Sequence, residues 1–292
     1  MVHRLVPGSA SILPAATTAL TPEQWRPLEA AHHTRVDAAL AGHRARQARG
    51  EKHPVEDFLL TYYSYRPNQL RRWHPGAGVT LVHDDGSRRE LDAGAFLARR
   101  GDAVRHVRDL LQATASRPAN LGCFGLHEWA MVYRMAADDV RHAGWPLRLG
   151  PAGTDAVVES HRLRCSHFDA FRFFTADAVP RNELRPTREL QVELDQPGCL
   201  HATMDLYKWA YKLSPATPSS LVMDCFELAR DVRVLDMRAA PYDLRPLGYQ
   251  PVAVETPEGK AEYVAAQRVF ADRAAPLRAA LLEVCHLLLR AD

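Results

Sequence analysis

The sequence predicts a predominantly helical α+β protein with a small antiparallel sheet. Several long segments carry helix start and stop signals, whereas only two regions carry signals for strands. No internal repeat, low-complexity tract or clear linker divides the 292 residues. We therefore expect one globular domain over residues 21–292, preceded by a loosely packed arm over residues 1–20.

The helices are predicted from their capping residues and their apolar periodicity. Thr21 can cap the first helix, Pro22 suits its first position, and Gln24 completes a capping box. The predicted helical segments are 22–49, 92–115, 124–142, 201–213, 219–238 and a long terminal segment that opens at Thr256-Pro257. Pro276 is expected to kink or split the terminal helix.

Strands are predicted in two regions. Over residues 79–91, apolar residues flank Asp85-Gly86, a two-residue turn typical of a β-hairpin. Residues 155–174 are rich in valine and phenylalanine and indicate one or two further strands. The two regions lie far apart in the sequence, and they could pair in one small sheet.

Composition excludes several classes of protein. Hydrophobic residues make up 47% and charged residues 25%, and the net charge is +2 with histidine neutral. A chain with such balanced charge has no overall electrostatic field that attracts nucleic acid. Any contact with nucleic acid would therefore need a local basic patch. No GxGxxG motif follows a strand, and P-loop, GxSxG and kinase motifs are absent from the sequence.

The cysteines and the apolar segments indicate a location. The five cysteines are widely spaced and form no CxxC pair, which argues against a disulfide framework or a zinc ribbon. The N-terminal residues contain no signal-peptide core, and no apolar stretch reaches the roughly 18–20 residues of a membrane helix. We expect a cytoplasmic protein with reduced thiols.

The predicted helix 124–142 contains a candidate acid–base pair, His127 and Glu128. On a helix these residues could form the wall of a cleft, or they could lie on a solvated polar face. Position 131 is Met, so the HExxH zinc motif is absent.

A second candidate lies in the segment 161–174. If this segment is a strand, His161, His167 and Asp169 share one side that is otherwise apolar. Such a set could ligate iron in a facial triad, or His167 and Asp169 could form an acid–base pair. A structural hydrogen bond between the two is the simpler alternative.

A third candidate is the polar stripe of the predicted helix 201–213. His201, Asp205 and Lys208 follow one another at helical spacing. The first two could hold a metal ion or pair with each other, and Lys208 could meet a phosphate. The alternative is an exposed, charge-paired helix face.

Aromatic and arginine residues are concentrated between positions 62 and 74. Tyr63, Tyr65 and Trp73 could stack on bases, and Arg66 could contact phosphate. They could instead be core aromatics with arginines at the edge. The acidic run over residues 224–243 could offer carboxylates to a site or balance its neighbouring arginines.

Several segments resemble an actinobacterial protein family usually labelled 3-methyladenine DNA glycosylase. These segments are GLHEWAMVYR (125–134), SHRLRCSHFDAFRFFT (160–175), MDLYKWAYKLSP (204–215), DCFELARDVRVLDMRAAPYDL (224–244) and ETPEGKAEYV (255–264). The resemblance covers most of the chain from about residue 20. The chain carries no helix-hairpin-helix run of the LPGIG type and no zinc-binding cysteine set of the kind found in better-known alkylpurine glycosylases.

The resemblance implies removal of an alkylated purine from DNA without a cofactor. Such an enzyme needs a flipped-base pocket with stacking aromatics and a carboxylate that supports the oxocarbenium-like transition state. Asp169 or Glu128 would supply the carboxylate. The stacking residues would come from Tyr63, Tyr65, Trp73 or Trp209.

Residue chemistry alone supports an alternative. In it the chain is an enzyme of small-molecule metabolism that depends on iron or zinc, with His167, Asp169 and His161 as ligands. His127, Glu128 or His201 could complete the metal shell. A binding or resistance protein without turnover is the third possibility.

Overall fold

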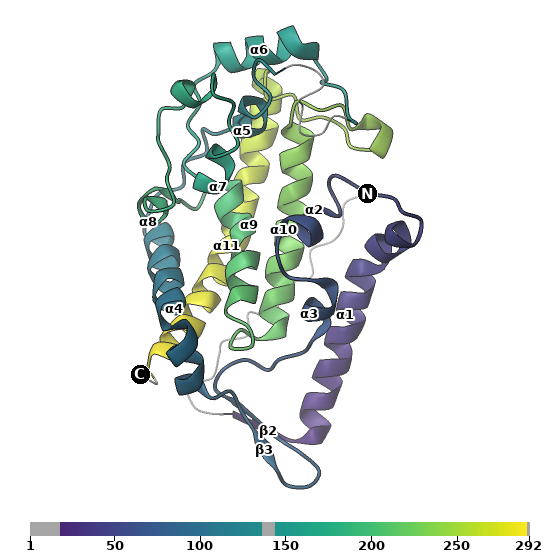
Figure 1. Ribbon diagram of the computed structural model, residues 1–292, viewed down its shortest axis with the longest axis vertical. Coiled ribbons are helices and arrows are strands. Elements are labelled where there is room, and N and C mark those ends of the chain that lie inside the picture. The colour runs from purple at the N-terminus through teal and green to yellow at the C-terminus, as the bar shows by residue number, and fades with distance from the viewer. Residues whose placement is uncertain (1–17, 136–143, 291–292) are drawn as a thin grey trace.

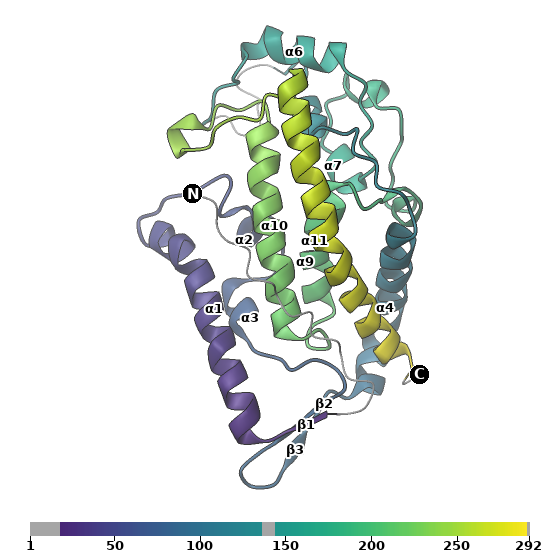
Figure 2. The ribbon, with the colours of Figure 1, turned by 180° about the vertical axis from the view of Figure 1, so that it is seen from behind.

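The computed structural model describes residues 18–135 and 144–290. Three long helices run side by side along the molecule (Figures 1 and 2): α9 (Leu200–Lys212), α10 (Ser219–Ala239) and α11 (Pro257–Leu289). On either side of them lie α1 (Pro22–Ala48) and α4 (Ala93–Ala115). The expectation of a mostly helical α+β fold is confirmed.

The helix ends follow their capping residues. The Gln24 side chain accepts from the Thr21 backbone N–H at 2.9 Å, which completes one arm of the expected capping box. Asp92 and Thr256 cap α4 and α11 through their side-chain oxygens. The α11 helix continues through Pro276 to Leu289, so this proline does not split it.

The sheet is mixed, which corrects the expectation of a purely antiparallel one. β2 (Val79–Val82) and β3 (Arg88–Arg89) form the predicted hairpin, with Gly86 at φ +78° in its turn. β1 (Thr18–Leu20) pairs with β2 in parallel and begins with a bond from the Thr18 N–H to the Gly78 carbonyl. Residues 18–20 therefore belong to the fold, and residues 1–17 of the predicted arm lie outside the described part.

The prediction of strands over residues 155–174 is wrong. Residues up to 160 form α6 (Gly150–Ser160), whose buried side carries Thr154, Val157 and Val158. These positions have the i, i+3, i+4 spacing of a helix, although valine content alone indicates a strand. The remainder is irregular chain with a single bridge from Leu163 to Asn182, followed by the short α7 (Phe168–Phe171).

The long helix predicted over residues 124–142 is not observed in the part of this segment that the structure describes, residues 124–135. α5 (Leu126–Ala130) has one turn and begins after Gly125, whose φ is +70°. A Cβ there would lie 3.3 Å from the Tyr263 ring, so both backbone and space favour glycine. The chain then turns at Arg134, at φ +54°, and residues 136–143 lie outside the described part.

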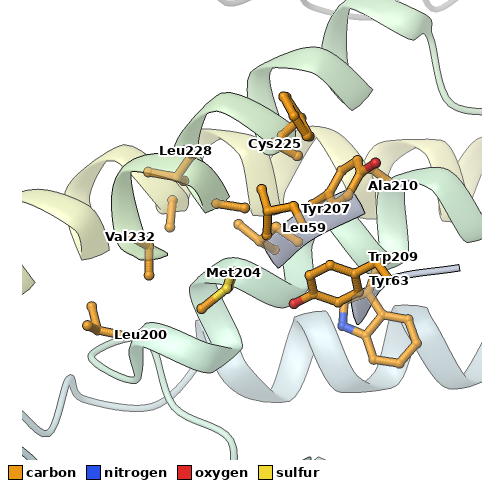
Figure 3. Packing of buried hydrophobic residues seen from close by; sticks show 14 of the residues in the cluster. Leu59, Tyr63, Leu200, Met204, Tyr207, Trp209, Ala210, Cys225, Leu228 and Val232 are labelled. Carbon is orange, nitrogen blue, oxygen red and sulfur yellow. The ribbon is translucent and has the colours of Figure 1, made fainter. Parts of the chain in front are cut away.

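The core is formed where α9 packs on α10 and both pack on α11. Figure 3 shows Met204 and Tyr207 of α9 facing Cys225, Leu228 and Val232 of α10. Each such large side chain contributes roughly 1.5–3 kcal/mol when fully buried. This packing fixes the relative positions of the polar residues that the two helices also carry.

Shorter elements complete the described part of the fold. They are α2 (Phe58–Tyr62), α3 (Pro67–Arg71), α8 (Gln191–Leu194) and the 3-10 turns η2 (Val179–Arg181) and η3 (Arg245–Leu247). The elements α5, α6 and α7 gather at one end of the long helices, and the sheet lies at the other (Figure 1). None of the described helices combines the length and the apolar character that crossing a membrane requires.

Candidate metal centre

Two histidines and an aspartate from three helices meet in the interior. They are His127 of α5, His201 of α9 and Asp236 of α10. Their possible ligand atoms all lie within 4.8 Å of one another. His127 Nε2 is 3.0 Å from Asp236 Oδ1, and the two imidazole rings lie 4.5 Å apart between centroids.

The helix periodicity of α10 explains why Asp236 is buried. It follows Ala229 and Val232 at spacings of seven and four residues, which places it on the apolar stripe of the helix. Its side chain is fully buried. A carboxylate in such a place is costly unless it has partners, so its neighbours matter.

Arg233 is a second cationic partner of this carboxylate, beside His127. Its Nη1 lies 2.8 Å from Asp236 and 3.3 Å from Glu128, and all three side chains are buried. The Phe58 ring covers the guanidinium at 3.9 Å. One guanidinium thus faces two carboxyl groups. A second positive charge, either an imidazolium or a metal ion, would balance the charge of this cluster.

The protonation of the three groups follows from their surroundings. Burial opposes ionisation of Asp236, but His127 and Arg233 outweigh it and hold the pKa of Asp236 well below its usual range. Burial also opposes charge on His127, but Asp236 outweighs it and raises the pKa of His127 well above 6.5. Burial and the nearby His127 lower the pKa of His201 well below 6.5, so His201 is a neutral imidazole.

His201 is the least constrained member of the group. Across the two described ranges it makes ring contacts with His127 and His167 but no hydrogen bond. A neutral imidazole with a free lone pair is the form that binds metal ions. The other ring nitrogen of His127 lies 3.8 Å from the Cys123 sulfur, the position of an outer partner that orients a ligand.

A second set of buried polar residues adjoins the first. His167 Nδ1 lies 2.9 Å from Asp195, while its Nε2 has no hydrogen bond among the described residues and lies 3.5 Å from Asp205. Asp205 also accepts from the Tyr63 hydroxyl at 3.0 Å and pairs with Lys208. The stripe of α9 is therefore buried, not an exposed charge-paired face.

Asp169 lies at the partly exposed side of this set. It accepts from the Tyr62 hydroxyl at 3.1 Å and from Arg172 Nε at 2.6 Å. Burial opposes its ionisation, but Lys208 and Arg172 outweigh that effect and lower the pKa of Asp169. Asp169 is thus a carboxylate held by three donors or cations.

Both sets line a cavity of about 280 Å³. Its walls are formed by Phe58, Thr61, Tyr62, Tyr63, Glu128, Met131, His167, Asp169, Phe173, His201, Met204, Asp205 and Arg233. This volume is close to the lower end of the range for small-molecule pockets, roughly 300–1,000 Å³. The cavity therefore suits one small ligand or one planar group of a larger ligand.

Most of the residues predicted from the sequence are brought together here. Glu128, His167, Asp169, Tyr63, His201 and Asp205 line the cavity, with His127 and Lys208 directly behind them. The prediction that His127 and Glu128 lie on a solvated face is wrong, because both are buried. His167 and Asp169 still face the same cavity, although irregular chain and the first turn of α7 present them instead of a strand.

Five predicted residues lie elsewhere, among them Trp209, whose ring lies 6.0 Å from that of His106 outside the cavity. His161 ends α6 and bonds to the Val157 carbonyl at 2.7 Å. Arg66 is exposed at the start of α3, and Trp73 stacks on Trp25 beside the sheet. Tyr65 stacks on Tyr211 at 4.8 Å outside the cavity.

The sequence prediction missed Asp236, Arg233 and Asp195 as site residues. The signal for Asp236 was present, since a carboxylate that continues an apolar helix stripe demands a buried partner. Arg233 three residues earlier was the partner available on the same helix. No comparable signal marks Asp195, which lies in irregular chain after α8.

No protein-family model, no curated protein and no solved structure matches this chain.

Proposed function

We propose that this protein is a metal-dependent enzyme that acts on a small molecule, with His127, His201 and Asp236 as the metal ligands. The observation that carries the proposal is the approach of their ligand atoms within 4.8 Å in the interior. The ligands expected from the sequence, His167, Asp169 and His161, are replaced because their ligand atoms do not converge in the described part of the chain, where His161 directly follows α6.

The geometry suits a first-row transition metal. Ligand bonds of about 2.0–2.2 Å place neighbouring donor atoms roughly 3 Å apart, as His127 Nε2 and Asp236 Oδ1 are. Two imidazoles and one carboxylate are the donors of the facial iron(II) triad, and zinc accepts the same types. A bound ion would polarise a substrate group or a water molecule on the open side.

The cavity supports a small substrate. His201 lines it, so a ligand in the cavity reaches the proposed metal position directly. Glu128 and Arg233 on the same wall can orient a polar group, and Asp205 and Asp169 can accept protons or hydrogen bonds. The five free cysteines fit the cytoplasmic location that we also propose.

Metal analysis tests this proposal. Protein purified without chelator, then reconstituted with Fe²⁺ or Zn²⁺ and desalted, should retain about one ion per chain. His201→Ala should lose that ion, whereas His43→Ala, which alters a histidine outside the cavity, should keep it. A wild-type protein that retains no ion after reconstitution contradicts the proposal.

The family resemblance supports a second candidate function, that of an alkylpurine DNA glycosylase. One observation favours it: Phe58 and Tyr62 stack at 4.9 Å on the cavity wall beside the carboxylate of Asp169. Flat rings and a carboxylate are what a flipped, cationic purine requires. Release of 3-methyladenine from alkylated DNA, unaffected by EDTA and abolished by Asp169→Asn, would support it, and no release would exclude it.

A further inference from the structure

A large groove lies apart from the cavity and shares none of its lining residues. Its volume is about 1070 Å³. It is lined by Ser64, Tyr65, Gln69, Arg72, His74, Leu97, Arg99, Arg100, Asp102, Arg105, Tyr211, Lys212, Pro215 and small residues between them. Four arginines and one lysine thus surround a space that contains one carboxylate, that of Asp102.

Not every arginine of this groove has a carboxylate partner, in contrast to several arginines elsewhere on the surface. Arg35, for example, contacts both Asp224 and Glu227, at 2.7 and 2.8 Å. In the groove, Arg105 lies 3.5 Å from Asp102, but the guanidinium groups of Arg72 and Arg99 make no hydrogen bond or ion pair with any residue that the structure describes. The guanidinium of Arg100 donates to the Lys212 carbonyl, at 2.6 Å. The donors of Arg72 and Arg99 are therefore available to an anion.

Other lining residues of the groove offer different chemistry. Tyr65 stacks on Tyr211 with the rings inclined by 12°, which presents a flat aromatic surface. The Ser64 hydroxyl, 3.4 Å from the Tyr211 hydroxyl, and the Gln69 amide add neutral hydrogen-bonding groups. Guanidinium groups recognise phosphate, and aromatic faces recognise a planar organic group.

We propose that this groove binds a small organic phosphate, with Arg72 and Arg99 on the phosphate and Tyr65 and Tyr211 beside the organic part. The observations favour a small ligand over nucleic acid. The net charge of +2 gives no extended basic surface, and Asp102 on α4 interrupts the cationic wall. The proposal is independent of the metal centre.

The test compares adenosine 5′-monophosphate with adenosine as probes. Titration calorimetry on metal-free wild-type protein should show binding of the monophosphate and at least about tenfold weaker binding of adenosine, because the arginines contact the phosphate. The double substitution Arg72→Ala/Arg99→Ala should weaken binding of the monophosphate by at least about tenfold. Metal-free protein keeps this test separate from the proposed metal chemistry.

A matched variant controls for the loss of two surface charges. Arg88→Ala/Arg268→Ala removes two arginines outside the groove and should leave the monophosphate affinity within about twofold. Equal loss in both double variants, equal binding of adenosine, or no binding of the monophosphate would overturn the proposal. So would binding of a twelve-nucleotide oligo(dT) by a protein that does not bind the monophosphate, since that result assigns the groove to nucleic acid.

Discussion

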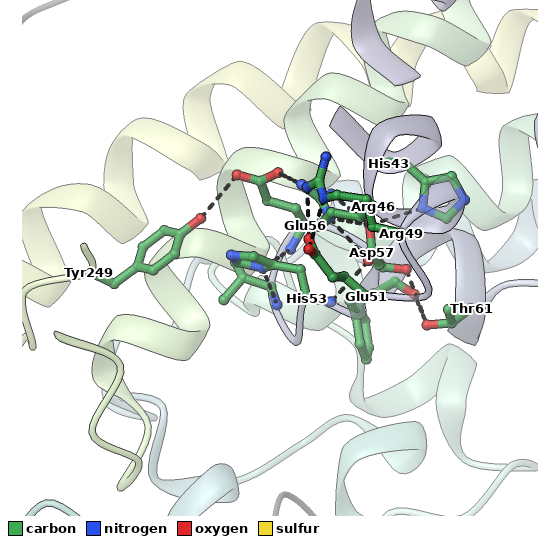
Figure 4. A network of polar contacts seen from close by, with 11 residues as sticks. His43, Arg46, Arg49, Glu51, His53, Glu56, Asp57, Thr61 and Tyr249 are labelled. Carbon is green, nitrogen blue, oxygen red and sulfur yellow. Dashed lines mark hydrogen bonds and ion pairs between the residues drawn. The ribbon is translucent and has the colours of Figure 1, made fainter. Parts of the chain in front are cut away.

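Two clusters in this protein combine a histidine, an aspartate and an arginine. Figure 4 shows the first, in which Asp57 accepts from His43 at 2.9 Å, from Arg46 at 2.6 Å and from the His53 backbone N–H at 2.9 Å. The network continues to the surface through Glu56, which lies 2.7 Å from Arg46. Asp57 lines none of the cavities described above, and both of its oxygens are satisfied by the chain itself.

The second cluster, His127, Asp236 and Arg233, has the same residue types but a different environment. It adjoins a cavity, and His201 reaches the same point without a hydrogen bond in the described part of the chain. The first cluster ties the end of α1 to the chain before α2, whereas the second reaches a cavity through Arg233 and the neighbouring His201. The contrast shows that residue types alone do not define a site. A site is indicated by a side chain, such as that of His201, that lines a cavity and lacks a hydrogen-bond partner among the described residues.

Matched substitutions of the two aspartates should separate the clusters most strongly. Asp236→Asn should weaken zinc binding by at least about 100-fold, because a carboxylate ligand is lost, while Asp57→Asn should leave it unchanged. The measurement is a competition titration with a chromophoric chelator. Similar zinc affinities in the two variants would remove the distinction drawn between the clusters.

The two arginines should differ in their contribution to stability. Arg233→Met leaves Glu128 and Asp236 buried without their guanidinium, which should cost about 3–5 kcal/mol of unfolding free energy. Arg46→Met should cost less, since Asp57 keeps His43 and a backbone donor. Urea denaturation of metal-free protein measures both costs. An Arg46→Met loss as large as that of Arg233→Met would contradict the expected order.

His74 extends the comparison to a histidine without a carboxylate partner among the described residues. Burial, with Arg72 and His32 nearby, lowers the pKa of His74 to about 4. The unfolded chain therefore binds a proton more readily than the folded one between pH 6.5 and 4. The contribution of neutral His74 to the free energy of unfolding is fully present above pH 6.5 and is lost as the pH falls toward 4.

The variant His74→Gln removes this titration. Its melting temperature should fall less than that of the wild type between pH 7 and pH 4.5, as thermal denaturation across that range would show. The backbone bonds of residue 74 to Ser219 do not depend on the imidazole, so the fold is retained. Parallel pH profiles for the two proteins would show that His74 is not the cause.

The smallest effects are expected from the tyrosines of the two regions. Tyr63→Phe leaves Oδ1 of the buried Asp205 without its hydroxyl donor, although Lys208 still pairs with Oδ2, and should cost about 1–3 kcal/mol. Tyr249→Phe removes a 3.4 Å contact with the partly exposed Glu56, so a change within about 0.5 kcal/mol is expected. Chemical denaturation resolves the two, and a reversed order would show that burial does not set these costs.

Local signals in the sequence predicted much of the fold. Thr21-Pro22 and Thr256-Pro257 marked the starts of two long helices, and Asp85-Gly86 marked the hairpin. The strand over residues 18–20 was missed because three residues carry no periodicity, and its pairing with β2 is a tertiary effect.

The candidate site was only partly predictable. His127, His167 and His201 were identified separately, His167 on a predicted apolar face and the other two on predicted polar helix faces. Their convergence depends on how α5, α9 and the chain before α7 pack, which no local pattern encodes. Asp236 belonged to an acidic run that could serve a site or balance its neighbouring arginines, and only its burial separates it from the other acids of that run.

An anomalous diffraction experiment tests the central claim most directly. Crystals of zinc-reconstituted protein, measured on both sides of the zinc absorption edge, should show one strong peak about 2.0–2.2 Å from His127 Nε2, a ring nitrogen of His201 and an oxygen of Asp236. The absence of a peak there, or a peak bound only by surface histidines, would contradict the proposed metal centre.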